Sequence, residues 1–461
     1  MAVPAALADQ RVVVGSDGRG LVVAGSEQAV LVLGPPRSGK TTTLVVPNVL
    51  AAWGPVVSTS TKPDVLAATV DARRRRGRCW LYDPSGTVPP PPGVERLRWS
   101  PVASALTWDG ALLVARAMVG AARPATGTSD ATHWSERAEA LLAPLLHAAA
   151  IGGDDLGEVV MWVNRHDGTH AAVRLASGSG TAADLLAGLL ATDPRELSGI
   201  WSTASGVLGA YRSDAAQASA WDPNFDARRF VASTDTLYIC AGSRHQELVA
   251  PLVVGLIEDV RAGAFERASA RTASGLGAAA PDVPAGPWAT VDAPVLLALD
   301  ETANIAPIPD LPSLVSEGGS QGVLTLACLQ DLSQARRRWG AEAEGFGSLF
   351  GATVVLPGIG DVRTLEALSV LCGSEDVWVR SESRSPGMPI GRGRSRTWSS
   401  HRQRRLAPDE IGRGRPGSAL LLGGGRRPSW SPLSPWWTVP GWGRPLPARD
   451  RALGWTGHVD R

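Results

Sequence analysis

The fold of this chain is decided by the octapeptide Gly34-Pro35-Pro36-Arg37-Ser38-Gly39-Lys40-Thr41. It has the phosphate-loop spacing G-x-x-x-x-G-K-[ST]. The apolar residues 29–33 before it predict a buried parallel strand, and residues 42–50 after it predict a short helix that stops near Pro47. In this context the backbone N–H groups at the end of the loop would converge on a phosphate at the positive end of the helix. We therefore expect residues 34–41, together with Thr42, to bind the phosphates of a nucleotide.

The use of lysine supports this prediction. Lysine occurs only at Lys40 and Lys62, although the chain has 45 lysine and arginine residues in total. A compact ammonium group can reach the β- and γ-phosphates, whereas the bidentate guanidinium group has the wrong shape for that position. Lys40 is therefore predicted to act on the phosphates in catalysis. The alternative, a glycine-rich turn that matches the pattern by chance, is disfavoured by the strand and helix around it.

The composition is that of a globular protein with a sizeable core. The 461 residues are enough for about two or three domains, and 44% hydrophobic with 19% charged residues is an ordinary balance. A formal net charge of +1 gives no global basic field, so any nucleic-acid site must be local. No signal-peptide pattern and no apolar stretch of about 18 residues is visible, so we expect a cytoplasmic protein. The cysteines are expected to be free core thiols, as suits a reducing cytoplasm; they are Cys79, Cys240, Cys328 and Cys372.

Residues 1–100 are predicted to form the first part of a nucleotide-binding domain. A β-rich lead-in comes before the phosphate loop. After the loop, strands are predicted at residues 56–60 and 79–84, with a helix from Val65 to Arg76 between them. The order β-α-β-α-β indicates a parallel sheet with right-handed crossovers.

The rest of the chain divides into three regions. Residues 101–225 have apolar residues at helical spacing and almost no strand pattern, which predicts an inserted all-α domain. Residues 226–430 are predicted to complete the nucleotide-binding domain, with a helix from about residue 248 to 267 and a flexible loop at 268–290. Residues 431–461 are expected to be an irregular tail rich in Trp and Pro. The predicted fold class is therefore α/β, a P-loop NTPase with a parallel-rich central sheet and an inserted all-α domain.

A second decisive stretch is the apolar strand 294–299, which ends in Asp300 and Glu301. An apolar strand followed by two acids is the Walker B pattern. Asp300 would hold Mg²⁺ through water, Thr41 would ligate the same ion, and Glu301 would act as general base on the attacking water. The alternative is a strand that merely ends at a polar turn, and the phosphate loop in the same chain weighs against it. The predicted cofactors are ATP and Mg²⁺.

Gln330 is a third candidate catalytic residue. It follows the predicted buried strand 323–329, so it would lie beside the Walker B residues at the same end of a parallel sheet. There it would sense the γ-phosphate or orient water. The alternative is a plain strand-end glutamine. Further short apolar strands are predicted at 353–357 and 419–422.

Several phrases of the sequence closely resemble, in the same order, the TraG/TraD-type coupling ATPases of conjugation and type IV secretion. Residues 299–305 (L-D-E-T-A-N-I) are similar to the family's L-D-E-x-A-N-I, and Gln330 and Gln334 match its Q-x-x-x-Q spacing. Other similar pieces are S-x-K-x-D at 60–64, D-P at 83–84, W-S-P-V at 99–102, P-D at 309–310, G-G-S-Q-G at 318–322 and R-L-A-P-D-E-I at 405–411. The resemblance covers most of residues 29–430.

The resemblance implies a RecA-like nucleotide-binding domain with an inserted all-α domain, assembled as a homo-hexameric ring around a DNA channel. The implied partners are DNA, bound without regard to sequence, the relaxase or relaxosome, and components of the type IV secretion channel. Two departures stand out: the usual N-terminal transmembrane helices are not seen, and Gly319 replaces the arginine of the family's G-R-S segment. The first departure implies membrane contact only through a partner, with the chain cytoplasmic or peripheral at the inner face of the plasma membrane.

Arginine residues supply two further predictions. Ring ATPases often complete their active site with an arginine from the neighbouring subunit, and the candidates are Arg336, Arg337, Arg338 and Arg363. Two basic runs could contact DNA phosphates: residues 73–78, and residues 380–405, which hold eight arginines and one acid. The second run is rich in Gly and Ser and is predicted to be a mobile loop that grips the DNA backbone. A solvated charged loop is the alternative.

Three functions are compatible with these patterns. The favoured one is an ATP-hydrolysing coupling protein and DNA translocase, stimulated by DNA, that delivers DNA or a relaxase–DNA complex to a type IV conjugative secretion system. The second is a soluble FtsK/HerA-like DNA pump without a secretion channel. The third is a nucleotide-gated substrate receptor that moves nothing.

Overall fold

The computed structural model describes residues 11–16, 21–122, 129–275, 293–384, 394–423 and 425–439. Its centre is a ten-stranded sheet in the order β14-β13-β10-β3-β9-β8-β4-β7-β5-β6. In chain order these strands are β3 Val30–Leu33, β4 Val56–Ser60, β5 Cys79–Tyr82, β6 Glu95–Arg96, β7 Thr236–Cys240, β8 Val295–Leu299, β9 Val323–Leu329, β10 Ala352–Val355, β13 Ser418–Gly423 and β14 Ser429–Pro432. All neighbours from β10 to β6 are parallel, and only the edge pairs β10–β13 and β13–β14 are antiparallel. The predicted α/β class with a parallel-rich central sheet is confirmed.

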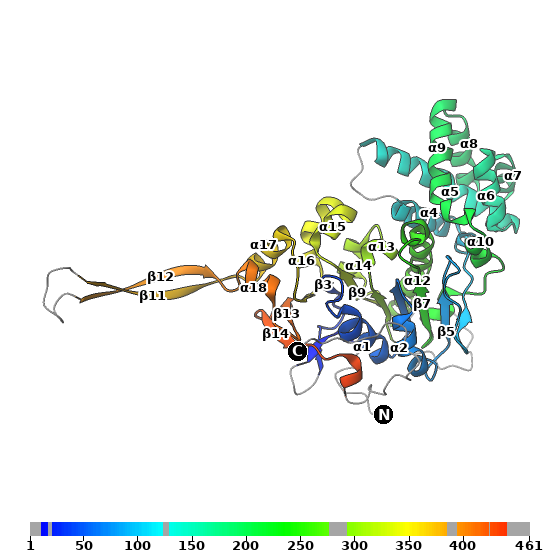
Figure 1. The fold of residues 1–461 in the computed structure, drawn as a ribbon. Coiled ribbons are helices and arrows are strands. Elements are labelled where there is room, and N and C mark those ends of the chain that lie inside the picture. The colour runs from blue at the N-terminus through cyan, green and yellow to red at the C-terminus, as the bar shows by residue number, and fades with distance from the viewer. Residues whose placement is uncertain are drawn as a thin grey trace.

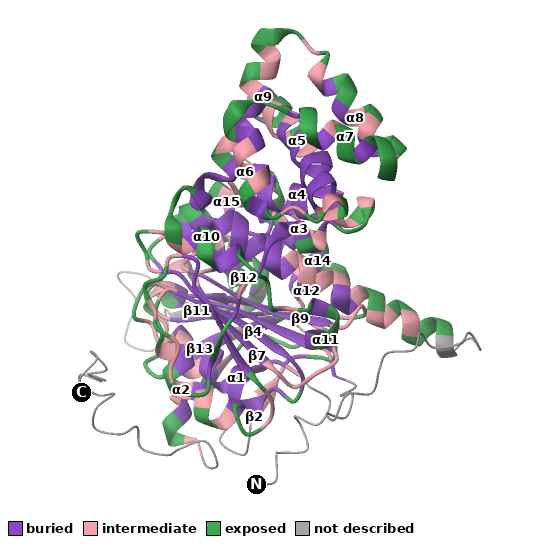
Figure 2. Cartoon of the chain, turned by 90° about the vertical axis from the view of Figure 1, so that its right-hand side faces the viewer, coloured by how far each residue is buried: buried purple, intermediate pink, exposed green. Residues whose placement is uncertain are grey.

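Both faces of this sheet are covered, which is why central strands such as β3 and β8 are apolar at every position rather than at every second one. Within β3, Val30 and Val32 belong to a core shared with α1 (Val46–Ala51) and α2 (Asp64–Arg73). Leu31 and Leu33 belong to a second core on the opposite face, which continues into α12 (Gln246–Gly275). Figure 2 shows the buried sheet between these layers.

The described chain between β6 and β7 is helical. Its helices are α3 Pro101–Ser104, α4 Trp108–Ala122, α5 Ser129–Gly152, α6 Leu156–Arg165, α7 Thr169–Gly178, α8 Gly180–Leu190, α9 Pro194–Val207, η3 Gly209–Arg212, α10 Asp214–Ala220 and α11 Ala227–Val231. They form the helical layer of Figure 1, in which α5 packs on α4, α7, α8 and α9 while α4 packs on α12. At Gly255 in α12 a Cβ would lie 2.6 Å from the Trp99 ring, so the small residue permits this close approach. The domain division at residues 100/101 and 225/226 stays a prediction.

Three predicted boundaries are wrong. The helix after the phosphate loop does not stop near Pro47: a π-helical turn, η2 (Thr41–Val45), leads into α1, and Pro47 lies in the first turn of α1, where it has no N–H to satisfy. Helix α12 runs to Gly275, beyond the predicted start of the loop at 268, and the rest of that loop, residues 276–290, lies outside the described residues. The tail predicted to be irregular from residue 431 begins inside a strand, because β14 includes Ser431 and Pro432 and pairs with β13.

A two-stranded arm is the largest difference between the predicted fold and the structure. Strands β11 (Ser374–Arg384) and β12 (Arg394–Arg404) pair in antiparallel register along their whole length and project away from the body (Figure 1). The prediction of a mobile loop at residues 380–405 is therefore wrong for 380–384 and 394–404. Neither face of the arm is buried, so its sequence lacks the alternation of apolar and polar residues that predicts a strand. The hydrogen bonds between the two strands satisfy the backbone N–H and C=O groups. Residues 385–393 lie outside the described residues.

The remaining elements connect these layers. They are the hairpin β1 (Val13–Ser16) and β2 (Leu21–Val23), then α13 Thr302–Ile305, α14 Leu311–Glu317, α15 Leu332–Trp339, η4 Gly340–Gly345, α16 Phe346–Leu349, α17 Val362–Leu371, α18 Pro408–Arg413 and η5 Trp436–Thr438. In the part of the chain that is described, no helix is both long and apolar enough to cross a membrane.

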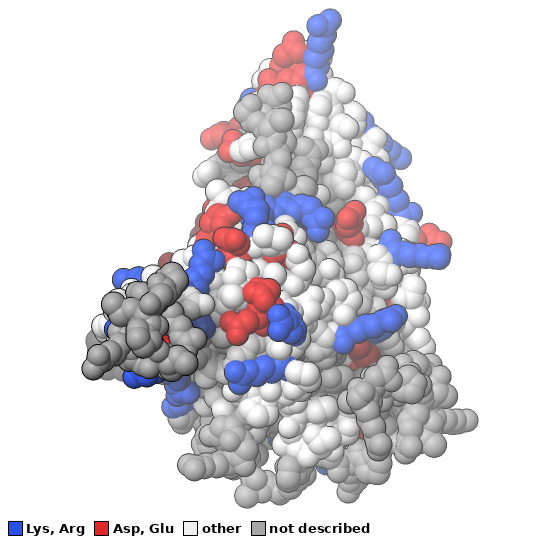
Figure 3. Space-filling model, turned by 60° about the vertical axis from the view of Figure 1, so that its left-hand side comes forward, with Lys and Arg blue, Asp and Glu red and all other residues white. Residues whose placement is uncertain are grey.

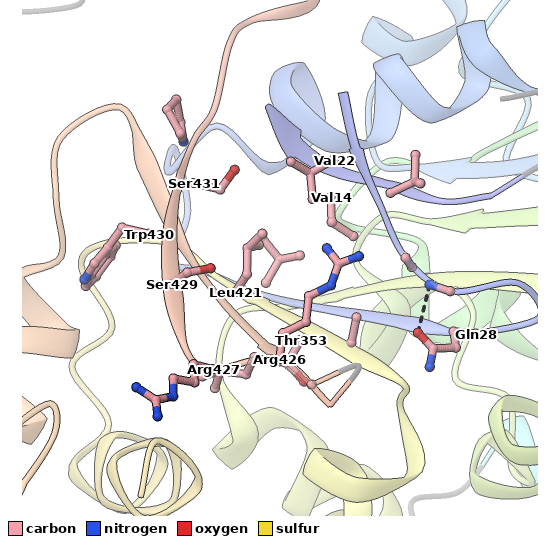
Figure 4. Close-up of a pocket in the computed structure, with 18 residues that line it drawn as sticks. Val14, Val22, Gln28, Thr353, Leu421, Arg426, Arg427, Ser429, Trp430 and Ser431 are labelled. Carbon is pink, nitrogen blue, oxygen red and sulfur yellow. Dashed lines mark hydrogen bonds between the residues drawn. The ribbon is translucent and has the colours of Figure 1, made fainter. Parts of the chain in front are cut away.

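A pocket of about 460 Å³ lies at the antiparallel edge of the sheet (Figure 4). Side chains of the β1–β2 hairpin, β10, β13 and β14 line it, among them Val14, Val22 and Trp430. The exposed Arg426 and Arg427 also line it. None of its lining residues belongs to the phosphate loop or follows the tips of β8 or β9, so this pocket is separate from the candidate nucleotide site.

Candidate active site

The phosphate loop connects β3 to η2, and its backbone has the shape that the motif requires. Gly39 has φ +93° and Arg37 has φ 64°, both in the left-handed region that turns a chain sharply. A Cβ at Gly34 would lie 2.7 Å from Ser38 Oγ and 3.0 Å from the Leu356 Cβ, so this position accepts only glycine. The loop thus closes tightly on itself ahead of the helix.

Two side chains of the loop are directed to its interior. Lys40 is buried, and its Nζ donates hydrogen bonds to Gly34 O at 2.6 Å and Pro35 O at 3.0 Å. The Ser38 hydroxyl oxygen is buried and has no hydrogen-bond partner among the described residues. A buried hydroxyl without a partner is unfavourable by about 1–3 kcal/mol, which a phosphate oxygen at this place would relieve.

The structure joins the Walker A and Walker B motifs, which are 259 residues apart in the chain. The Thr41 hydroxyl donates to Asp300 Oδ2 at 2.7 Å. The backbone of Asp300 is also fixed, because Thr59 near the end of β4 donates a hydrogen bond from Oγ1 to the Asp300 carbonyl at 3.0 Å. Order in the sheet explains the meeting, since β3 and β8 are separated only by β9 and all three strands end at the same edge.

Burial dominates the electrostatics of Asp300. Desolvation raises the pKa of its carboxyl to about 6, and the nearby Glu301 and Asp64 raise it further, while the Thr41 hydrogen bond and Lys40 act in the opposite direction. The pKa of Asp64 is also raised, chiefly by burial, and its carboxylate accepts a hydrogen bond from Ser60 Oγ at 3.0 Å. Acidic side chains in such surroundings attract a cation.

Glu301 begins a chain of hydrogen bonds that leads back to Gln330. Its backbone is left-handed (φ 55°, ψ 45°), which costs a residue other than glycine about 1–3 kcal/mol and is typical of functional turns. Asn304 donates a hydrogen bond from Nδ2 to Glu301 Oε2 at 3.0 Å. Its Oδ1 accepts a long hydrogen bond of 3.5 Å from Gln334 Nε2. The Gln334 Oε1 in turn accepts the backbone N–H of Gln330 at 3.0 Å.

Gln330 itself lies where the sequence predicted, at the tip of β9 between the phosphate loop and the Walker B residues. Its catalytic role stays a prediction. Sequence reasoning assigned no role to Asn304 or Gln334. The signals that could have found them are the Asn of the L-D-E-x-A-N-I phrase and the spacing of four residues from Gln330 to Gln334 in α15.

These residues fit a nucleotide with Mg²⁺. A hydroxyl and a carboxylate in contact, Thr41 and Asp300, are hard oxygen ligands of the kind that Mg²⁺ uses beside water and phosphate. Among the described residues no group of three or more His, Cys, Asp and Glu is arranged to hold a metal ion. A magnesium ion that shares its ligands with a nucleotide needs no such group.

Two of the four arginines proposed to act on a neighbouring subunit are partly buried and held by contacts within this chain. Arg336 forms an ion pair with Asp361 at 2.7 Å, and Arg338 donates hydrogen bonds to the carbonyls of Gly120, at 3.1 Å, and Ala121 at the end of α4. Burial lowers the pKa of Arg338 to about 10. Arg337 and Arg363 are exposed, and Arg363 forms a surface ion pair with Glu344 at 3.6 Å. These two remain the candidates.

The basic run 73–78 is not a free patch for DNA. Arg73 is fully buried and donates to Thr236 Oγ1 at 2.6 Å, Gly54 O at 2.9 Å and Thr234 O at 3.0 Å. Burial lowers its pKa to about 10. Arg76 donates to the carbonyl of Ala52. The prediction is therefore wrong for Arg73, which ties the end of α2 to the segments that lead into β4 and β7.

The fold and this site define the class of protein: an α/β, RecA-like P-loop nucleotide-binding protein. Residues 294–414 match the family model described as the TraM recognition site of TraD and TraG. The chain thus resembles the TraG/TraD-type coupling proteins, as its sequence phrases predicted. A comparison with curated proteins found no match.

Solved structures give the same fold. The bacterial conjugative coupling protein TrwBdeltaN70, in an unbound form, is similar with a TM-score of 0.67 and 18% identity over 92% of this chain and 94% of that one. Plasmid coupling protein TrwB with the non-hydrolysable ATP analogue ADPNP is similar with a TM-score of 0.62 and 18% identity over 89% and 86% of the two chains. TrwB with ADP and Mg²⁺ has a TM-score of 0.61 and 18% identity over the same shares. The bound groups of these structures agree with the predicted cofactors, ATP and Mg²⁺.

Proposed function

We propose that this chain is an ATP-hydrolysing coupling protein that delivers DNA, or a relaxase bound to DNA, to a type IV conjugative secretion system. The observation that carries the proposal is the 2.7 Å contact between Thr41 and Asp300, which unites both Walker motifs in one site. The likeness of the fold to TrwB, and of residues 294–414 to TraD and TraG, supports the choice of a coupling protein among P-loop proteins.

Each side chain of the site would have one task. Lys40 would exchange its loop carbonyls for β- and γ-phosphate oxygens, and Ser38 would donate its hydroxyl hydrogen to a phosphate oxygen. Thr41 and Asp300 would hold Mg²⁺, which neutralises charge on the phosphates when bound. Glu301, oriented by Asn304, would accept a proton from the attacking water, while Gln330 would orient that water or sense the γ-phosphate.

The partners belong to the same proposal. The matched family model is named for recognition of TraM, so we infer that the region 294–414 contributes to docking on the relaxosome. Assembly as a homo-hexameric ring, sequence-independent binding of DNA and contact with the secretion channel follow from the same resemblance. In such a ring, Arg337 or Arg363 would reach the site of the neighbouring subunit.

ATP turnover by the purified full chain, with and without single- and double-stranded DNA, tests this function. We expect turnover that DNA stimulates in the wild type, and loss of turnover in Lys40→Ala and in Glu301→Gln. Arg165→Ala, a change at the exposed last residue of α6, is a control that should leave turnover unchanged. Particle mass measured on the same sample tests the ring. Turnover by Lys40→Ala equal to that of the wild type would refute the assignment.

A further inference from the structure

The two faces of the β11–β12 arm differ in chemistry. In an antiparallel pair, residues directly opposite each other share a face, and so does every second residue along a strand. The register sets Trp378 opposite Ser400 and Arg380 opposite Trp398. One face therefore presents the arginines and tryptophans of the arm, which in the described side chains are Trp378, Arg380, Arg396, Trp398, Arg402 and Arg404. We call this the Arg/Trp face.

The opposite face carries no arginine among its described side chains. It presents Val377 and Val379 on β11 and Ser399, His401 and Gln403 on β12, with Glu375 near the base of the arm. Two acids, Asp376 and Glu382, interrupt the Arg/Trp face. The separation by face thus concentrates guanidinium and indole groups on one side of a narrow ribbon.

The two tryptophans are unusually open. Trp378 is 65% exposed and Trp398 is 60% exposed. Their register makes them diagonal neighbours on one face, roughly 7–8 Å apart by the geometry of paired strands. Because large indole rings usually bury most of their surface, a pair left open on a projecting arm indicates a partner that stacks on them.

Arginines flank this pair. Arg380 and Arg402 have no hydrogen-bond or ion-pair partner among the described residues. Arg396 and Arg404 form only long ion pairs, with Glu382 and Glu366, each at 3.7 Å on exposed side chains. Figure 3 looks towards the arm and shows Lys and Arg side chains gathered around it. The surface therefore complements a polyanion.

We propose that the Arg/Trp face of the arm binds unpaired segments of nucleic acid, with bases stacked on Trp378 and Trp398 and phosphates on Arg380 and Arg402. Every base has a flat face that can stack on an indole ring, so such contacts do not depend on sequence. In a duplex both faces of each base are already covered by neighbouring bases, and only the arginines can contribute. The arm would thus favour single strands over duplexes.

This inference rests on the proposed function only in taking DNA as the polyanion. Tryptophan and arginine are also frequent at protein interfaces, so a protein partner is the competing explanation for the same surface. The ratio of single-strand to duplex affinity separates these two explanations. If the surface binds a protein, removing the indole rings should leave that ratio unchanged.

The test uses the full chain and a fluorescein-labelled oligonucleotide, alone and as its duplex, with binding followed by anisotropy at fixed salt. In Trp378→Ala/Trp398→Ala we expect single-strand affinity to fall at least about tenfold and duplex affinity to change less than about twofold. Trp378→Phe/Trp398→Phe should restore part of the loss. Trp221→Ala removes an indole ring of 66% exposure outside the arm and should change neither. Melting curves check that each variant is folded.

Single-strand binding by the double alanine variant equal to that of the wild type would overturn the inference, as would equal losses for single strand and duplex. ATP turnover without DNA, measured on the same samples, should be unchanged in these variants. If turnover depends on Lys40 and duplex binding persists while the arm tryptophans prove irrelevant, the inference fails and the proposed function stands. If the wild type binds neither form of DNA, the inference fails and the DNA part of the proposed function fails with it.

Discussion

The candidate nucleotide site, where β3, β8 and β9 end, and the β11–β12 arm differ in how their functional side chains are held. At the nucleotide site, Thr41, Asp300 and Asn304 are buried or half-buried. Thr41 is hydrogen-bonded to Asp300 at 2.7 Å across 259 positions of the chain, and Asn304 to Glu301 at 3.0 Å. On the arm, Trp378 and Arg380 are exposed. The nucleotide site is preorganised for one geometry, whereas the side chains of the arm stay exposed and can contact nucleic acid of varied sequence. Substitutions should therefore act on rate at the nucleotide site and on binding at the arm.

The largest effect is expected at Lys40. Lys40→Ala should lower ATP turnover by about 10³-fold, because the ammonium group stabilises charge that develops on the phosphates. Affinity of the arm for single-stranded DNA in the absence of nucleotide should stay within about twofold of the wild type. Turnover assays and anisotropy on one preparation check both halves. A parallel loss of DNA affinity would show that the two regions are not independent.

Asp300→Asn should separate stability from activity. Because burial raises the pKa of Asp300 to about 6, the folded state favours the protonated carboxyl, and stability is lost as pH rises from about 4 to 6. The neutral amide avoids this loss and can still accept the Thr41 hydrogen bond. In EDTA the variant should gain up to about 3 kcal/mol at pH 8 and almost nothing at pH 4. With Mg²⁺ present, its ATP turnover should fall, though less than in Lys40→Ala. Denaturant unfolding at the two pH values measures the difference. A stability gain of the same size at pH 4 would contradict the assigned cause.

Asn304→Ala tests whether Glu301 needs its partner. We expect kcat to fall about 10–50-fold with KM nearly unchanged, because the substituted side chain orients the general base and lies outside the phosphate loop. Ser316→Ala, on an exposed position of nearby α14, is the matched control and should behave as the wild type. An unchanged kcat would show that the left-handed backbone of Glu301 is sufficient by itself.

The smallest effect is expected from the charges of the arm. Arg380→Ala/Arg402→Ala should reduce the slope of log affinity against log salt by about 1.4–1.8, as expected for two lost phosphate contacts, and lower affinity severalfold at moderate salt. Arg165→Ala/Arg195→Ala removes the same charge from exposed positions of the helical layer and is the control. Equal slopes for both double variants would show that the arm has no special role in binding phosphate.

The same contrast explains what sequence could predict. Apolar strands such as 295–299 were placed correctly because a parallel strand buried on both faces leaves a continuous signal. The phosphate loop and Asp300 were predicted to share one site because their residue types and spacing are tied to one chemistry, and the structure brings Thr41 and Asp300 into contact. The arm was taken for a loop because no buried face marks its strands, and the only constraint on it is cross-strand pairing.

Arg73 shows the opposite limit. From sequence it is one of four consecutive arginines, and only the fold shows that its guanidinium group is buried among the carbonyls of Gly54 and Thr234. The hydrogen-bonded link from Glu301 through Asn304 to Gln334 could not be predicted from residue spacing either. Asn304 and Gln334 are 30 positions apart and meet only because the ends of two strands lie side by side. Contacts of this kind depend on strand order, which local pattern does not determine.

The central claim is that the joined Walker motifs hydrolyse ATP in a protein that acts on DNA. Its most direct test is ATP turnover by the full chain with and without single-stranded DNA, for the wild type and Glu301→Gln side by side. The account predicts turnover that rises with DNA in the wild type and is lost in the variant, which should still bind nucleotide. Equal turnover by the two proteins, or a wild type that binds ATP without hydrolysing it in the presence of DNA, would contradict it.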